Sequence, residues 1–207
     1  MGVGNSSEKE ILGRFLTGSE VGFEELVTRY ESKIYSLCLN LTRNEADSEA
    51  VLSDVFCKAL DELHTVCESN ISLSNYLYRT TIELASEKDA VAHPELESSS
   101  HSRMMQVVSA ALEDHYDESG DDEGLLRAAI HNLPYEYRAV YLLHEAMGVE
   151  MNDVMEILQV SELEARAFLH RARLMVCRYL QRFRGARTVV ANLGSRTARR
   201  PATRVLI

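Results

Sequence analysis

Residues 150–179, EMNDVMEILQVSELEARAFLHRARLMVCRY, carry the clearest helical pattern of the chain. It predicts a short helix over 150–158, a tight turn over 159–161, and a longer helix over 162–179, because Ser161 is a good N-cap followed by first-turn glutamates. At about 100° per residue, one side of the second helix is apolar and a basic set lies about a quarter turn away. The apolar set is Ala165, Phe168, Leu169, Ala172 and Val176, and the basic set is Arg166, His170 and Arg173.

A helix-turn-helix needs this division, because one face packs on a scaffold while the other meets phosphates and base edges in a DNA groove. Arginine suits the second face, since its planar guanidinium can bind phosphate or guanine in bidentate fashion. The same spacing also fits a plain helical hairpin with a solvated basic stripe. The spacing by itself therefore leaves DNA binding and this plainer alternative open.

The charge distribution separates the two ends of the chain. The net charge is -10, but all 32 acidic residues lie at or before Glu164. Residues 1–165 contain all 32 acidic residues and 11 of the 22 lysines and arginines, so their net charge is -21. Residues 166–207 contain the other 11 basic residues and have a net charge of +11. This asymmetry predicts a nucleic-acid or acidic partner for the C-terminal end and a different partner for the body. A solvated acidic surface with a basic tail is the alternative.

Length and composition limit the class of protein. A chain of 207 residues with 45% hydrophobic and 26% charged content fits one large or two small soluble domains. No apolar run approaches the roughly 18 residues of a membrane span, and the start lacks a signal-peptide core. We therefore expect a cytoplasmic protein without membrane insertion. Ten glycines and three prolines disfavour a turn-rich all-β fold.

The residues that commonly carry catalysis or bind metals do not form a recognisable pattern. There is no glycine-rich phosphate loop or nucleophile elbow, so we expect no enzyme activity and no cofactor. The cysteines show no CxxC spacing, and Cys38 and Cys57 have apolar neighbours, which predicts that both are core residues. His64 and Cys67 lie near Cys57 but lack a fourth ligand, so no metal site is expected.

Helical periodicity predicts an all-α chain with two small helical domains. Residues 1–88 are expected to form a helical bundle, and residues 89–123, rich in Ser, Asp and Glu, an acidic flexible linker. Residues 124–183 contain the helix-turn-helix. Residues 184–207 hold six arginines without apolar periodicity and are expected to be a basic disordered tail.

Two blocks of the sequence resemble bacterial RNA polymerase sigma factors of the extracytoplasmic-function (ECF) type. Residues 133–176, LPYEYRAVYLLHEAMGVEMNDVMEILQVSELEARAFLHRARLMV, resemble region 4 of that family. Residues 23–60, FEELVTRYESKIYSLCLNLTRNEADSEAVLSDVFCKAL, resemble region 2, and residues 75–79, NYLYR, resemble the end of region 2 that reads the minus-ten element. The matching marks in region 4 are Leu133-Pro134, Arg138, Leu142-Leu143, Gly148, Ile157-Leu158, Val160-Ser161 and residues 169–173.

The resemblance implies a sigma factor that binds core RNA polymerase and directs promoter-specific initiation, with no cofactor. The implied polymerase-binding residues of region 2 are Asp47, Glu49, Asp54 and Lys58. The residues implied to read and melt the minus-ten element are Asn75, Tyr76, Tyr78 and Arg79. Those implied to contact the minus-thirty-five element are Ser161, Arg166, His170, Arg171 and Arg173. The implied partners are core polymerase, promoter DNA and an anti-sigma factor, with the protein on the nucleoid when polymerase is bound.

The sequence also departs from the family at several positions. The family usually has a Gln-Glu pair where this chain has Ser53-Asp54, and basic residues where residues 81–87 are net acidic. In the recognition helix, Phe168 replaces a commonly basic residue and Glu164 a small or hydroxyl residue. These departures leave a second interpretation: a sigma-like interaction module that sequesters an anti-sigma factor, or a divergent sigma factor that needs an accessory partner.

Deleting residues 184–207 removes six arginines. If these bind phosphate, the salt dependence of DNA binding should become shallower by about 0.9 in the log–log slope for each phosphate that is no longer neutralised. Fluorescence anisotropy with a promoter duplex at several salt concentrations measures this slope. An unchanged slope would show that the tail does not touch phosphate.

Overall fold

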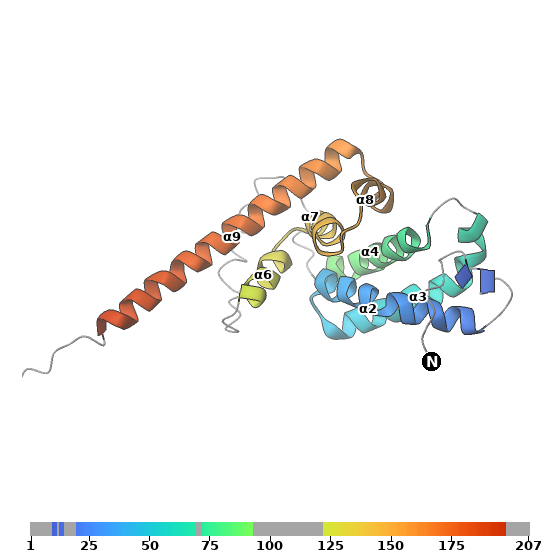
Figure 1. The fold of residues 1–207 in the computed structure, drawn as a ribbon, viewed down its shortest axis with the longest axis horizontal. Helices are drawn as coiled ribbons and strands as arrows, with labels where there is room; N and C mark the ends of the chain where they lie inside the picture. The colour runs from blue at the N-terminus through green and yellow to red at the C-terminus, as the bar shows by residue number, and fades with distance from the viewer. Residues whose placement is uncertain (1–9, 12, 15–19, 69–71, 93–121, 198–207) are drawn as a thin grey trace, which may run out of the picture.

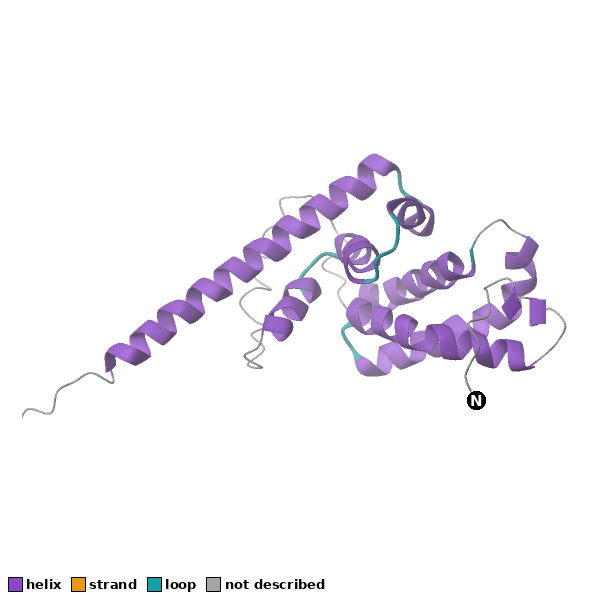
Figure 2. Cartoon of the chain, viewed as in Figure 1, coloured by secondary structure: helices purple, strands orange, loops and turns teal. Residues whose placement is uncertain are grey.

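The computed structural model describes residues 10–11, 13–14, 20–68, 72–92 and 122–197. Within these ranges the ordered elements are helices and no strand occurs, which confirms the all-α prediction (Figure 2). The elements are α2 (Glu20–Thr42), α3 (Glu45–Glu68), α4 (Leu73–Ala92), α6 (Asp122–His131), α7 (Tyr135–Tyr141), the π-helix η2 (Leu142–Ala146), α8 (Met151–Leu158) and α9 (Glu162–Thr197).

Helices α2, α3 and α4 pack against one another as a three-helix bundle (Figure 1). Each presents an apolar face with helical spacing to the common core, as expected for a bundle helix. The buried side chains include Leu26, Ile34, Leu37 and Leu41 from α2, Val51, Val55 and Ala59 from α3, and Leu77 and Ala85 from α4. A left-handed residue, Arg43 (φ 60°), ends α2. The side-chain oxygen of Asn44 then accepts the Asp47 N–H at 3.1 Å and caps α3.

Helices α6 and α7 pack along the first half of α9. Their shared core holds Ala129, Leu133 and Tyr137 on one side and Ala172, Val176 and Tyr179 on the other. The predicted helix-turn-helix is confirmed: α8 ends at Gln159 in the left-handed conformation (φ 54°), and the Val160 N–H bonds to the Met155 carbonyl at 3.2 Å. Helix α9 starts at Glu162, as predicted.

Three boundaries differ from the sequence prediction. Helix α4 continues to Ala92 and α6 starts at Asp122, so the ends of the expected 89–123 linker are helical, and residues 93–121 lie outside the described ranges. Helix α9 continues to Thr197, so the expected disordered tail is wrong up to that residue. Lack of apolar periodicity argues against packing but not against helix formation, because a helix already nucleated by docking only has to be extended. Residues 198–207 are outside the described part of the chain.

The cysteine prediction is half right. Cys38 is buried in the core, and this burial raises the pKa of its thiol to about 12. Cys57 is exposed. Its neighbour Phe56 faces the core, and a step of about 100° along α3 turns the next side chain away from it.

The two helical units share one apolar core. The buried cluster of the first unit continues into Ala139, Val140 and Leu143 of α7 and η2 and into Val154 and Ile157 of α8. Helix α4 contacts both α7 and α8, and α2 contacts α6 and α7. In Figure 1 the second unit therefore lies along one side of the bundle, while the C-terminal part of α9 projects away from both.

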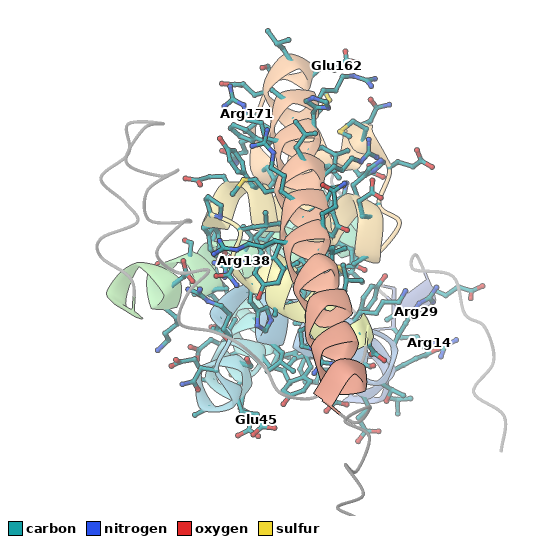
Figure 3. The ribbon with its side chains drawn as sticks, turned by 90° about the vertical axis from the view of Figure 1, so that its left-hand side faces the viewer. Arg14, Arg29, Glu45, Arg138, Glu162 and Arg171 are labelled. Carbon is teal, nitrogen blue, oxygen red and sulfur yellow. The ribbon has the colours of Figure 1, made fainter. Side chains whose placement is uncertain are left out.

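A buried ion cluster lies at the joint between the units. One carboxylate oxygen of Asp89 accepts hydrogen bonds from Nη2 of Arg43 and of Arg138, each at 2.9 Å. The two arginines also donate through Nη1 to the carbonyl of His131, at 3.1 Å and 3.4 Å. Figure 3 shows Arg138 in the interior, and its side chain is fully buried. Burial, followed by the nearby charge of Arg43, lowers the pKa of Arg138.

We expect Asp89→Asn to lower the free energy of unfolding by about 3–5 kcal/mol, because it leaves the buried Arg138 without its anion. Urea denaturation followed by circular dichroism measures the change. The matched control is Glu123→Gln, which breaks an exposed pair with Arg127 and should change stability by about 0–1 kcal/mol. Equal effects of the two substitutions would contradict a structural role for the Asp89 cluster.

Candidate nucleic-acid interface

Helix α9 begins with a capping box formed by Ser161 and Glu164. The Ser161 hydroxyl oxygen accepts the Glu164 N–H at 3.3 Å, and the Glu164 carboxylate accepts the Ser161 N–H at 2.9 Å and its hydroxyl at 2.6 Å. The bond from the Ser161 hydroxyl, then that from its backbone, lowers the pKa of Glu164. The unusual glutamate at position 164 thus stabilises the helix start. Ser161 has a capping role here, and its contact with DNA stays a prediction.

The basic residues predicted on α9 lie on its exposed side. Arg166, His170, Arg171 and Arg173 are all exposed, while Ala165, Leu169 and Ala172 are buried against the scaffold. Figure 3 shows Glu162 and Arg171 near the start of α9, away from the buried Arg138. The structure therefore confirms that the helix separates a packing side from a basic side.

Each of the three exposed arginines has an intramolecular partner, although Arg171 lies about 140–160° around the helix from Arg166 and Arg173. Arg166 Nε donates to Glu162 at 2.8 Å, Arg173 pairs with Glu145 of η2, and Arg171 Nη1 donates to the Tyr137 hydroxyl at 3.2 Å. The two ion pairs are solvent-exposed, and exposed pairs contribute only about 0–1 kcal/mol. A phosphate group can replace these carboxylates at little energetic loss.

A hollow of about 330 Å³ lies beside the basic side of α9. It is lined by His144, Met151, Arg166, Leu169 and Arg173, from η2, α8 and α9. The turn between η2 and α8 contains Gly148 in the left-handed region (φ 69°), which favours glycine, and a His144 ring nitrogen lies 2.9 Å from the Val149 carbonyl oxygen. Arg166 and Arg173 therefore border a concave surface.

The residues predicted to read the minus-ten element are largely covered. Asn75 is 5% exposed, and its amide nitrogen donates to Asp153 at 3.1 Å and to Glu156 at 3.2 Å. Arg79 Nη2 donates to the main-chain carbonyl of Glu156 at 2.6 Å. Tyr78 is 6% exposed and belongs to the core. Helix α8 therefore covers this part of α4 in the described conformation.

Tyr76 is more accessible than Tyr78, the other aromatic residue predicted to contact the minus-ten element. It is half-buried, and its hydroxyl donates to the Glu62 carboxylate at 3.0 Å. Burial, and then this hydrogen bond, raises the pKa of Tyr76 to about 12. The phenol is therefore neutral at physiological pH and keeps its donor proton.

The four predicted polymerase-binding residues all lie on α3, but they do not form one surface. At about 100° per residue, Asp47, Asp54 and Lys58 share one side of the helix, whereas Glu49 lies about 160° from Asp47. Asp54 and Glu49 are exposed, and Asp47 and Lys58 are half-exposed. Lys58 Nζ lies 3.7 Å from the Glu83 carboxylate of α4. Their role in polymerase binding stays a prediction.

Sequence reasoning missed the contacts between the two units. Asp89 falls in the expected linker, although it is the anion shared by Arg43 and Arg138, from which it is separated by 46 and 49 residues. Asp153 and Glu156 stand three residues apart in α8, a spacing that places both on one helix face. That spacing could have predicted that Asp153 and Glu156 share a binding partner, but it does not identify Asn75 as that partner.

Neither a metal-binding cluster nor a membrane-spanning helix occurs in the described ranges. They contain no group of three or more His, Cys, Asp or Glu side chains placed to hold a metal ion, and the side chains of His64 and Cys67 lie outside what is described. Of the helices described, none is long and apolar enough to span a membrane.

The described helices have the fold of ECF sigma factors, and the similarity covers both units. No family model matches the chain. Two curated relatives come from Bacillus subtilis (strain 168). ECF RNA polymerase sigma factor SigW is 23% identical over 164 residues, 75% of this chain and 87% of the relative. RNA polymerase sigma factor SigV is 22% identical over 149 residues, 70% of this chain and 83% of the relative.

Two solved structures share the fold. One is CnrH in complex with the cytosolic domain of CnrY, with a TM-score of 0.58, 16% identity, and coverage of 85% of this chain and 98% of that one. The other is the sigma factor RpoE in complex with the anti-sigma factor NepR from Bartonella quintana, also with a TM-score of 0.58 and 16% identity, over 77% and 96% of the two chains. The resemblance to ECF sigma factors predicted from residues 23–60 and 133–176 is confirmed.

We expect Ser161→Ala to lower the free energy of unfolding by about 1 kcal/mol, the usual effect of losing an N-cap side chain. Ser161→Asn, which keeps a good capping residue, is the control and should change stability less. Urea denaturation of both variants provides the comparison. An equal loss in both would contradict the capping role.

The capping box also predicts a pH dependence. The pKa of Glu164 is lower in the folded chain than in the unfolded one, so its stabilising contribution is present above the unfolded pKa and is lost as the pH falls through the folded pKa. Glu164→Gln should therefore weaken the decline in stability on acidification. Thermal melts of both proteins between neutral and acidic pH test this, and parallel declines would refute it.

Proposed function

We propose that this chain is a sigma factor that binds core RNA polymerase and directs promoter-specific initiation of transcription. The observation that carries the proposal is the similarity to SigW and SigV over 70–75% of the chain, which spans both helical units. In this proposal α2–α4 form region 2, the unit expected at residues 1–88, and α6–α9 form region 4, expected at 124–183. The segment between them is the linker.

The basic side of α9 supports binding to the minus-thirty-five element. Arg166, His170 and Arg173 are exposed, and the two arginines border a concave surface. Recognition helices place their N-terminal residues against base edges in the major groove, and arginine is the commonest partner of guanine. Arg171 is bonded to the Tyr137 hydroxyl and lies about 140° around α9 from Arg166, so it is suited to a flanking phosphate and not to the same groove.

The minus-ten element would bind along α4 through Asn75, Tyr76, Tyr78 and Arg79. An aromatic ring suits this task because an unstacked base can stack on it, which contributes about 1–3 kcal/mol for each base. Because α8 covers Asn75 and Arg79 in the described conformation, this function requires α4 and α8 to separate. Polymerase binding through the side of α3 with Asp47, Asp54 and Lys58 would hold the separated units on the enzyme.

An anti-sigma factor is a further proposed partner. Two proteins with the same fold, CnrH and RpoE, form complexes, CnrH with the cytosolic domain of CnrY and RpoE with the anti-sigma factor NepR. The alternative that this chain only sequesters such a factor is supported by the exposed Glu83 and Glu87 near the end of α4, where carboxylates repel phosphate. The exposed arginines of α9 favour the DNA-binding proposal, because a decoy has no need of them.

The test uses Arg166→Ala combined with Arg173→Ala. We expect affinity for the minus-thirty-five element to fall about fivefold or more for each arginine, since a bidentate arginine–guanine contact gives about 1–3 kcal/mol of discrimination. Binding to core polymerase should remain. Arg127→Ala, which removes an exposed arginine of α6, is the control. Gel-shift assays with duplexes carrying and lacking the element, plus co-purification with core polymerase, provide the two readouts.

Loss of polymerase binding in the folded double variant would show that the assignment of the two regions is wrong. Initiation from a library of promoter fragments tests the whole proposal, because a sigma factor must select fragments that share two sequence blocks. A stable polymerase complex without initiation would favour a divergent sigma factor that needs an accessory partner. Failure to bind polymerase at all would favour the decoy.

A further inference from the structure

Leu163, the second residue of α9, is an apolar side chain in open solvent. It is 81% exposed, the highest value among the large apolar side chains of the described residues. Within those residues it belongs neither to the two buried apolar clusters nor to the side chains packed against them. The start of α9, marked by Glu162 in Figure 3, lies at the edge of the molecule. The packing of α9 therefore does not account for a leucine at this position.

The charged neighbours of Leu163 are engaged within the chain. Glu162 accepts a hydrogen bond from Arg166 Nε at 2.8 Å, and Glu164 accepts from the N–H and the hydroxyl of Ser161 in the capping box. Leucine has no hydrogen-bond donor or acceptor in its side chain. In the first turn of α9, Leu163 is thus available to a partner without the loss of any bond, and that partner must offer an apolar group.

Leu163 shares a side of α9 with basic residues proposed to bind DNA. At about 100° per residue, it lies about 60° around the helix from Arg166 and about 20° from His170. At about 1.5 Å per residue, the three side chains span about 10 Å of the helix axis, with Leu163 nearest the start. This length corresponds to about three base pairs at about 3.4 Å each. Helices that enter the major groove contact base edges through their N-terminal residues, so in the proposed complex Leu163 faces the bases.

We propose that Leu163 is a specificity-determining residue that contacts the 5-methyl group of a thymine in the minus-thirty-five element. This inference rests on the proposed function and extends it to the base that this side chain selects. The thymine methyl is the apolar group of the major-groove code, whose other marks are hydrogen-bond donors and acceptors that leucine cannot pair. Arg166 lies about 4.5 Å further along the axis, so the thymine is about one or two base pairs from a guanine that Arg166 contacts.

The test removes the methyl group from the DNA and the leucine side chain from the protein, separately and together. The full chain bound to core RNA polymerase selects a promoter duplex from a random library. Each thymine of its upstream block is then replaced in turn by deoxyuridine, which lacks only the 5-methyl group. Gel-shift assays compare the parent with Leu163→Ala. The matched control is Leu174→Ala, because Leu174 is an exposed leucine about 20° around the helix from Leu163 but about 16 Å further along it.

We expect one replacement to weaken binding by the parent and by Leu174→Ala about fourfold, the factor that corresponds to one buried methyl group. The same replacement should leave binding by Leu163→Ala unchanged, because its shortened side chain no longer reaches the methyl group. Equal responses of the parent and Leu163→Ala at every thymine would overturn the inference and leave the proposed function in place. Failure of the parent to select any duplex would contradict the proposed function, and the inference with it.

A protein partner is the alternative occupant of the exposed leucine. Co-purification with core polymerase is therefore measured for the parent, Leu163→Ala and Leu174→Ala. The inference predicts equal recovery of polymerase in all three, with unchanged circular dichroism. Reduced recovery with Leu163→Ala alone, together with an unchanged response to deoxyuridine, would show that this side chain contacts protein and would overturn the inference.

Discussion

The buried carboxylate of Asp89 is the interaction on which the arrangement of the two helical units depends. It accepts from Arg43 and Arg138, and the Arg138 side chain is fully buried. Taking a guanidinium out of water is tolerated only when an anion and further acceptors surround it, so the joint cannot shift without exposing or neutralising these charges. The Asp89 cluster therefore fixes where α7 lies on the bundle, and with it which face of α8 meets α4.

Two candidate DNA-binding surfaces follow from this arrangement, and they differ in accessibility. The basic side of α9 points to solvent, where its arginines make exposed pairs that a phosphate can displace. The surface of α4 faces α8, and Asn75 is nearly inaccessible. The described conformation therefore exposes the basic side of α9 and covers the surface of α4 that holds Asn75.

Two of the departures from the family pattern, Glu164 and Phe168, have physical reasons in the structure. Glu164 closes a capping box with Ser161 and turns its carboxylate to the helix start. Phe168 packs its ring 5.4 Å from that of Tyr137, so it belongs to the side of α9 that holds the scaffold. Neither residue offers an argument against DNA binding by the exposed side. The acidic residues near the end of α4 still argue against phosphate binding there, since Glu83 and Glu87 are exposed.

The all-α class, the helix-turn-helix with its start at Glu162, and the exposure of Arg166, His170 and Arg173 can be predicted from the sequence, because they depend on periodicity and caps within a few residues. Three other features follow from tertiary packing: Asp89 is a core residue, α8 covers Asn75, and α9 continues to Thr197. The first two of these features depend on contacts between residues that are 46 to 81 positions apart in the sequence, and no local pattern predicts such contacts. The third depends on docking of the first half of α9, which nucleates a helix that the remaining residues only have to extend.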